Sequence, residues 1–169
     1  SYATTTALLY WPHAVNKYDG TYYEYGISRS LPPLNNKRFN HALVWHKGII
    51  YAIGGSESLN SAFKPYDKDK FIEYLDYNKE MNWKIYSSYI FVDDANEASL
   101  GRYYHGACSF RDEIFIFGGR KDSNTSGRST RAFAFNPETG VVRKIEDLPG
   151  AIYPPISAVA YGSKIYVAG

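Results

Sequence analysis

Short apolar runs alternate with polar turns along the chain, and this pattern predicts β-strands. Residues 42–45 and 49–53 are mostly β-branched or large apolar residues, and the polar tight turn His46-Lys47-Gly48 joins them into a hairpin. The runs IIYAI, IFIF and IYV are apolar on both faces of a strand, so each is expected to be buried on both sides. We expect almost no helix, and none of three turns between Arg38 and Phe117.

This hairpin belongs to a stretch that recurs. Residues 38–54 read RFNHALVWHKGIIYAIG, residues 102–118 read RYYHGACSFRDEIFIFG, and a second glycine follows each. A third copy at residues 153–169, YPPISAVAYGSKIYVAG, keeps the apolar pattern but lacks the arginine and the histidine. Since glycine has no side chain to pack, each diglycine marks a sharp turn or a close approach of two backbones.

Two further strands are expected after each of the first two copies, separated from the diglycine by a polar segment. They lie at residues 71–77, 83–86, 131–135 and 141–145. Residues 1–37 have the pattern of the same two strands, at 4–11 and 21–27, before the proline break at 31–34. The repeating unit is therefore four antiparallel strands over about fifty residues, which is typical of a propeller blade.

At these positions the chain resembles the kelch repeats. The shared elements are an arginine and a histidine before the first strand, the diglycine after the second, and a tryptophan in the fourth. They are Arg38, His41, Gly54, Gly55, Trp83, Arg102, His105, Gly118 and Gly119. The second unit departs from the family pattern at Val142, where tryptophan is usual, and the third at Tyr153, where arginine is usual. The resemblance implies a β-propeller of four-stranded antiparallel blades.

The predicted boundaries give an incomplete ring. Residues 1–37 form the back half of a blade, 38–101 and 102–152 form one blade each, and 153–169 form the front hairpin of a further blade. A propeller closes with roughly four to eight blades, so we interpret the chain as part of a longer one that holds the remaining blades. Residues 1–169 alone are expected not to form a stable monomer, because strand edges stay unpaired.

The longer connections all emerge on one side of the predicted blades. They are residues 56–70, 87–101 and 120–130, whereas the turns on the opposite side are short. Long loops on a rigid scaffold often bind partners, and propellers that resemble kelch domains generally bind peptides or proteins on this face. The predicted partner-binding residues are Asn40, Tyr104, Ser56, Glu57, Arg120 and Lys121. The cations Arg120, Lys121, Arg128 and Arg131 favour either an acidic peptide or simply a solvated loop.

Repetition argues for structural roles at the other shared positions. His41 and His105 are equivalent in successive units, so a repeated packing or hydrogen-bonding role is expected rather than metal binding. Arg38 and Arg102 are expected to cap loop carbonyls rather than to hold a ligand.

Composition narrows the partner classes. The chain has 169 residues, 17% of them aromatic, and a formal net charge of +2, which is too small for nucleic-acid binding. The sequence contains no apolar run of about 18 residues, so we expect no membrane insertion. Cys108, the single cysteine, is predicted to be a buried hydrophobe and favours the cytoplasm, whereas the glycosylation triplet Asn124-Thr125-Ser126 would favour secretion.

Three classes of function stay open. The first is a scaffold that binds a protein or peptide, and the second is a structural subunit built permanently into a large assembly. The third is an enzyme of oxidase or isomerase type whose site lies partly on other blades. Because no G-x-S-x-G, H-E-x-x-H, C-x-x-C or phosphate-binding glycine loop occurs, we expect no catalytic residue, cofactor or metal in this chain.

Overall fold

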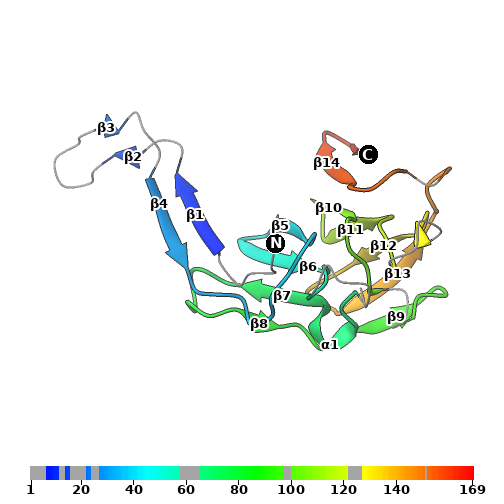
Figure 1. The fold of residues 1–169 in the computed structure, drawn as a ribbon, viewed down its shortest axis with the longest axis horizontal. Helices are drawn as coiled ribbons and strands as arrows, with labels where there is room; N and C mark the ends of the chain where they lie inside the picture. Colours follow the sequence, from blue (N-terminus) through cyan, green and yellow to red (C-terminus); the bar gives the residue numbers. More distant parts are fainter. Residues whose placement is uncertain are drawn as a thin grey trace.

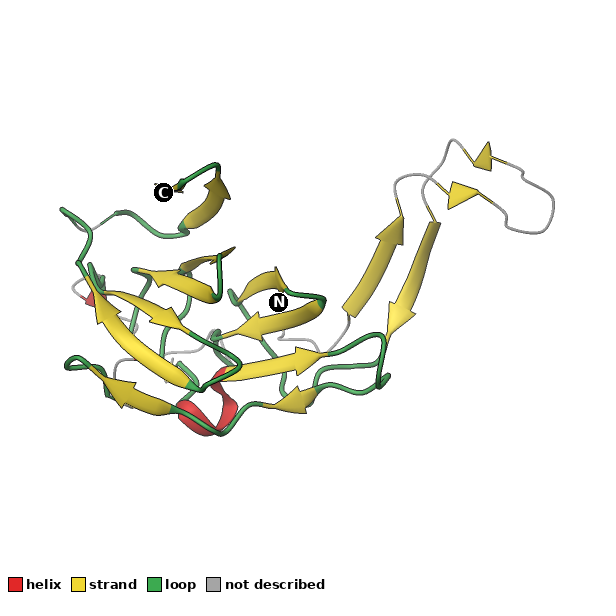
Figure 2. Cartoon of the chain, turned by 180° about the vertical axis from the view of Figure 1, so that it is seen from behind, coloured by secondary structure: helices red, strands yellow, loops and turns green. Residues whose placement is uncertain are grey.

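The structure is a computed structural model of the chain. It describes residues 7–11, 14–15, 22–23, 27–57, 65–96, 100–121, 127–150 and 152–169. In this part of the chain nearly all regular structure is β, and the sheets are antiparallel apart from one strand pair (Figures 1 and 2). Within those residues the helix α1 (Lys68–Phe71) makes a single turn. The prediction of an antiparallel β chain is confirmed.

The first complete sheet has four strands in chain order. They are β5 (Ala42–His46), β6 (Ile49–Ile53), β7 (Ile72–Leu75) and β8 (Lys84–Ile85). The predicted pairing of the first hairpin is confirmed, with Val44 opposite Tyr51. Lys47 and Gly48 form its turn with φ angles of 47° and 84°. Positive φ at both central residues suits the right-handed twist of the two strands, which explains the glycine there.

The second sheet repeats this order and adds a fifth strand. Its members are β10 (Gly106–Phe110), β11 (Glu113–Phe117), β12 (Ala132–Phe135), β13 (Val141–Ile145) and β9 (Ile90–Val92).

Strand β9 comes from the segment 87–101, which was predicted to be a loop, so that prediction is wrong in this part. It pairs in parallel with β13, and the Ile90 N–H donates to the Gly140 carbonyl at 2.8 Å. Without β9, the outer edge of β13 would have unpaired backbone N–H and C=O groups. The backbone of residues 90–92 forms hydrogen bonds with this edge.

Three short sheets complete the described chain. Strand β14 (Ser157–Tyr161) pairs with β15 (Lys164–Ala168), β1 (Ala7–Trp11) with β4 (Ile27–Leu31), and β2 (Ala14–Val15) with β3 (Tyr22–Tyr23). The partner of β1 therefore begins where the predicted strand 21–27 ends. Leu31 and Ala7 both pack against a buried cluster that contains Leu34, and this packing favours a strand that continues to the prolines. The β1–β4 hairpin, with β2 and β3 at its outer end, extends away from the sheets formed by β5 to β15 (Figure 1).

Equivalent strands of the three copies lie side by side. Strand β10 contacts β5 on one side and β14 on the other, so the first strands of successive copies form one wall (Figure 1). Backbone hydrogen bonds join the copies where these strands begin. The Tyr104 N–H donates to the Asn40 carbonyl at 2.9 Å, and the Ile156 N–H donates to the Tyr104 carbonyl at 3.0 Å. The repeat in the sequence is therefore also a repeat in space.

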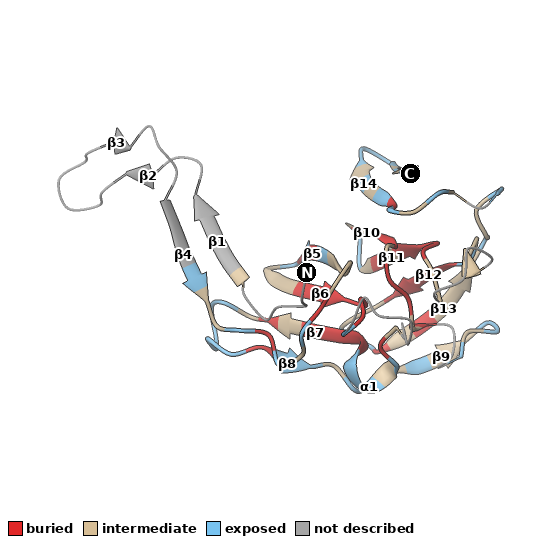
Figure 3. Cartoon of the chain, viewed as in Figure 1, coloured by how far each residue is buried: buried red, intermediate tan, exposed pale blue. Residues whose placement is uncertain are grey.

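The main core lies between the first and second sheets (Figure 3). It combines β-branched and aromatic side chains from β6, β7, β11 and β12 with those of the connecting segment. The fully buried members include Ile53, Phe71, Ile72, Ile114, Ile116, Phe133 and Phe135. All four residues of β12 are buried, so this strand is covered on both faces.

The third copy differs from the prediction. Residues of β14 and β15 alternate between partly buried and exposed, so the run IYV is not buried on both sides. Val159 is 60% exposed, Tyr161 78% and Tyr166 53%. One face of the hairpin packs against the second sheet through Ala158, Ile165 and Val167, and among the described residues no third strand pairs with it.

Candidate functional site

Arg38 and Arg102 hold the end of each long-loop connection. Arg38 donates to the carbonyls of Gly54 at 2.6 Å and Phe71 at 3.1 Å. Arg102 donates to the equivalent carbonyls of Gly118 at 3.0 Å and Arg131 at 3.1 Å. Both side chains are buried, so they cap loop carbonyls and offer no surface to a partner.

The charge of Arg38 is balanced by Glu73, which lies buried in β7. The guanidinium and carboxylate approach to 2.9 Å, and the backbone and side-chain amides of Asn35 and Asn36 also donate to this carboxylate. Burial alone would raise the pKa of Glu73, but the hydrogen bonds from Asn36 and the charge of Arg38 outweigh it and lower the pKa. The pair is therefore ionised at neutral pH.

The two repeated histidines are neutral at pH 7, because burial lowers the pKa of both His41 and His105. Burial lowers the pKa of His105 to about 3, and the charge of Arg102 acts in the same direction. No hydrogen-bond partner reaches either ring nitrogen of His105 among the described residues, although the Ile53 backbone lies near enough to favour protonation slightly. A site for a cation would need converging ligands, and these rings have the surroundings of packed core residues.

Gly54 and Gly119 show why glycine follows each second strand. A Cβ on Gly54 would lie 2.6 Å from the Arg102 carbonyl, and one on Gly119 would lie 2.7 Å from the Tyr103 carbonyl. Both residues also have positive φ, 65° and 88°. The strand ends can therefore pass beneath the neighbouring backbone only where no side chain is present.

Beyond the diglycines the two complete copies carry the same short backbone ladder. Ser56 pairs with Phe39, and Arg120 pairs in the same way with Tyr103. Asn40 and Tyr104 follow with left-handed φ angles of 53° and 57°, so both copies turn alike at this rim. The rim thus holds the predicted contact positions in a fixed, repeated backbone.

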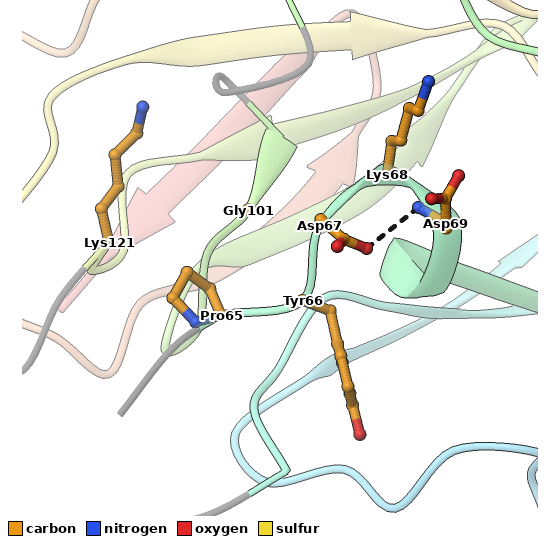
Figure 4. A pocket seen from close by; sticks show the side chains of 7 residues that line it. All are labelled: Pro65, Tyr66, Asp67, Lys68, Asp69, Gly101 and Lys121. Carbon is orange, nitrogen blue, oxygen red and sulfur yellow. Dashed lines mark hydrogen bonds between the residues drawn. The ribbon is translucent and has the colours of Figure 1, made fainter. Parts of the chain in front are cut away.

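A pocket of about 580 Å³ opens between the long loops of the two copies (Figure 4). Its wall is built from the end of the first loop, the residue before Arg102 and the start of the next loop. The lining residues are Pro65, Tyr66, Asp67, Lys68, Asp69, Gly101 and Lys121. This volume falls within the range of about 300–1,000 Å³ that ligand pockets occupy.

Local contacts hold this wall in place. The Tyr66 hydroxyl donates to the Lys37 carbonyl, and its ring lies under the Arg38 guanidinium at 5.0 Å. Asp67 accepts from the Asp69 N–H at 3.2 Å and so caps α1. Gly101 also lines the pocket, and a Cβ at this position would lie 3.0 Å from the Tyr66 carbonyl.

The six predicted contact residues have different surroundings. Ser56 is 1% exposed, so the prediction that its side chain contacts a partner is not supported by its position. Glu57 is exposed, and Asn40, Tyr104, Arg120 and Lys121 are partly exposed. Lys121 alone of the six lines the pocket. The lining residues Asp67, Lys68 and Asp69 were not predicted from the sequence. Three successive charged residues at the end of a long loop are the sequence feature that could have indicated them.

Other predictions receive little further information. The described residues contain no group of three or more His, Cys, Asp or Glu side chains that could hold a metal. Burial raises the pKa of Cys108 to about 11, as for an unreactive thiol. Among the described helices none is long and apolar enough to cross a membrane. The triplet Asn124-Thr125-Ser126 lies outside the described residues.

Comparison with known proteins identifies the repeat. Residues 101–149 match the family described as Kelch motif. Over 109 residues, 63% of this chain, the sequence is 27% identical to the leucine-zipper-like transcriptional regulator 1 homolog of Drosophila melanogaster. The chain spans about a tenth of the length of that relative, since the match covers 10% of it. The matched motif includes β10 to β13, and the capping arginine, the histidine and the diglycine of this segment recur in the first copy. The segment 101–149 is therefore similar to a kelch motif, and the first copy shares the residues that define it.

Proposed function

We propose that this chain forms part of a kelch-type β-propeller that acts as a protein-binding scaffold. In this proposal residues 38–101 and 102–152 each contribute one blade, with β9 of the first segment added to the second blade. Residues 1–37 and 153–169 belong to incomplete blades, and further blades close the ring. The partner protein or peptide binds the face that carries the loops at 56–70 and 120–130. The proposed compartment is the cytoplasm, in keeping with the single buried thiol.

The observation that carries the proposal is the pocket shared by two successive copies. Residues from two different long loops line it, and a hydrogen bond from the Tyr104 N–H to the Asn40 carbonyl joins the two copies that supply these loops. A surface built from several rigidly placed loops is the usual location of binding in a repeat fold.

The opposite ends of the sheets are closed instead. There the Lys47 ammonium lies 2.7 Å from Asp112 and 3.3 Å from Glu138, so the short turns of the two copies are linked to each other. Two-residue turns between β5 and β6 and between β10 and β11 leave little backbone that could adapt to a partner. This contrast favours the long-loop face.

The proposal is tested with Tyr104→Ala and Arg120→Ala in the full-length protein. Aromatic and arginine side chains are the commonest hot spots, and losing one can cost about 2 kcal/mol or more in binding. We expect each substitution to weaken partner binding, measured by calorimetry, by about thirtyfold. The melting temperature should fall by no more than a few degrees, because surface changes usually stay within about 0.5 kcal/mol.

The control shortens the turns at Lys47-Gly48 and at residues 136–140 on the opposite face, and binding should persist. If binding survives both alanine substitutions and is lost when these turns are trimmed, the interface lies on the other face and the proposal is wrong.

A second candidate, a structural subunit of a large assembly, is favoured by one observation. Large apolar side chains are exposed on the wall formed by the first strands, with Leu43 at 64% and Trp45 at 68%. A permanent interface would bury them, because such interfaces are more apolar than transient ones. Size-exclusion chromatography of the protein from its own cells distinguishes the two, since a subunit elutes only within its assembly.

A further inference from the structure

The pocket between the two long loops has a charge at each end, and this arrangement specifies a partner. Asp67 and Asp69 lie on one side of Gly101, and Lys121 lies on the other (Figure 4). The two ends belong to different copies of the repeat. Their separation is therefore fixed by the packing of the two sheets and not by one flexible loop.

The Lys121 end of the pocket is positively charged. Burial lowers the pKa of Lys121, and the charges of Arg102 and Arg131 lower it further. Arg120 precedes Lys121, and its Nε is buried with no hydrogen-bond partner among the described residues. An anion placed here would offset the repulsion among several cations.

The acidic end has the opposite character. Lys68 stands between the two aspartates, so this wall carries a net charge of −1. Both Asp67 and Asp69 are exposed. A cation near these carboxylates is attracted electrostatically, whereas a cation near Lys121 is repelled.

We propose that the pocket binds an extended segment of the partner protein that carries one acidic and one basic residue at a fixed spacing. The acidic residue faces Lys121 and the basic residue faces Asp67 and Asp69. Opposed charges at the two ends fix the direction of the bound segment as well as its position. This inference rests on the proposed scaffold function and adds the chemistry and the orientation of its ligand.

The test uses phage-displayed random dodecapeptides selected on the whole protein. We expect the enriched peptides to share an acid and a base in one order along the chain. Lys121→Glu should weaken their capture by about tenfold or more, since like charges across an interface disfavour binding. Peptides selected on the double variant Lys121→Glu, Asp69→Lys should carry the two charges in the reverse order.

Lys79→Glu is the matched control, because it makes the same change of charge on an exposed turn outside the pocket. It should leave capture within about twofold. Enriched peptides without a shared acid–base pair, equal capture by the Lys121→Glu protein, or no enrichment at all would each overturn the inference.

The outcomes also separate this inference from the scaffold proposal. Peptides that are lost with Tyr104→Ala or Arg120→Ala but indifferent to Lys121→Glu and Asp69→Lys would keep the long-loop face and remove the bipolar pocket. If peptides are lost only when the short turns are trimmed, both proposals are wrong.

Discussion

The two complete copies use the same arginine differently. Arg38 and Arg102 cap equivalent carbonyls, but the strand residue that each meets is not the same. Glu73 in β7 and Phe133 in β12 occupy equivalent positions. The last residue of the second strand pairs with Ile72 in the first copy and with Ala132 in the second, and Glu73 and Phe133 come next. Arg38 forms an ion pair with Glu73, whereas Arg102 lies over the ring of Phe133 at 4.8 Å.

This difference shows which part of the arrangement the repeat requires. The hydrogen bonds to the loop carbonyls recur, since a buried carbonyl without a donor is destabilising in any copy. The means of accommodating the buried charge does not recur. In the first copy a carboxylate does so with the help of Asn35 and Asn36, and in the second an aromatic face contributes. The arginine is thus a fixed structural part within variable surroundings.

The largest expected effect comes from removing the carboxylate of the first copy. Glu73→Ala leaves Arg38 buried without its counter-ion, and breaking one partner of such a pair typically costs about 3–5 kcal/mol. Urea unfolding of the full-length protein should show this loss in the free energy of unfolding.

Glu113→Ala is its control. Glu113 accepts two hydrogen bonds from Arg143, at 2.9 and 2.7 Å, but this pair is partly exposed, so the loss should be within about 1 kcal/mol. Equal losses for the two variants would mean that the Arg38–Glu73 pair contributes no more than a surface ion pair.

A smaller effect, about 2 kcal/mol, is expected from mild acid between pH 6.5 and 5. The folded pKa of His105, about 3, lies below its ordinary value, so its contribution is complete above about pH 6.5 and is lost as the pH falls toward 3. In that range the protein should lose about 1.4 kcal/mol of stability per pH unit through this residue. Urea midpoints between pH 7 and 5 for the wild type and His105→Leu measure the difference.

His105→Leu should flatten the dependence by one proton, while the contributions of the carboxylates remain in both proteins. Parallel pH dependences would show that His105 takes up its proton as readily in the folded state as in the unfolded one.

The smallest effect is expected at the link between the short turns. Lys47 bridges Asp112 and Glu138, but all three groups are exposed, and water and salt screen such pairs. Lys47→Ala should leave the urea midpoint at physiological salt unchanged within error. A clear loss that disappears in 1 M salt would indicate that this link holds the two sheets together after all.

The local elements could be predicted from the residue pattern. Alternating apolar and polar residues with a glycine turn fixed the β5–β6 hairpin, since hairpin geometry depends on neighbouring residues. The recurrence of arginine, histidine and diglycine identified the repeat and the structural role of these residues, because each copy solves the same packing problem. The rim positions Asn40 and Tyr104 followed from that equivalence.

Contacts between distant segments could not be predicted in this way and became known from the folded chain. Four features join residues that are far apart in the chain. They are the pairing of β9 with β13, the burial of Ser56, the burial of Glu73 against Arg38 and the pocket between Lys121 and Asp67. The exposure of Tyr161 and Tyr166 likewise depends on which sheet covers them. Local patterns state whether a residue can form a strand, but burial and charge pairing depend on the surface that folding places opposite it.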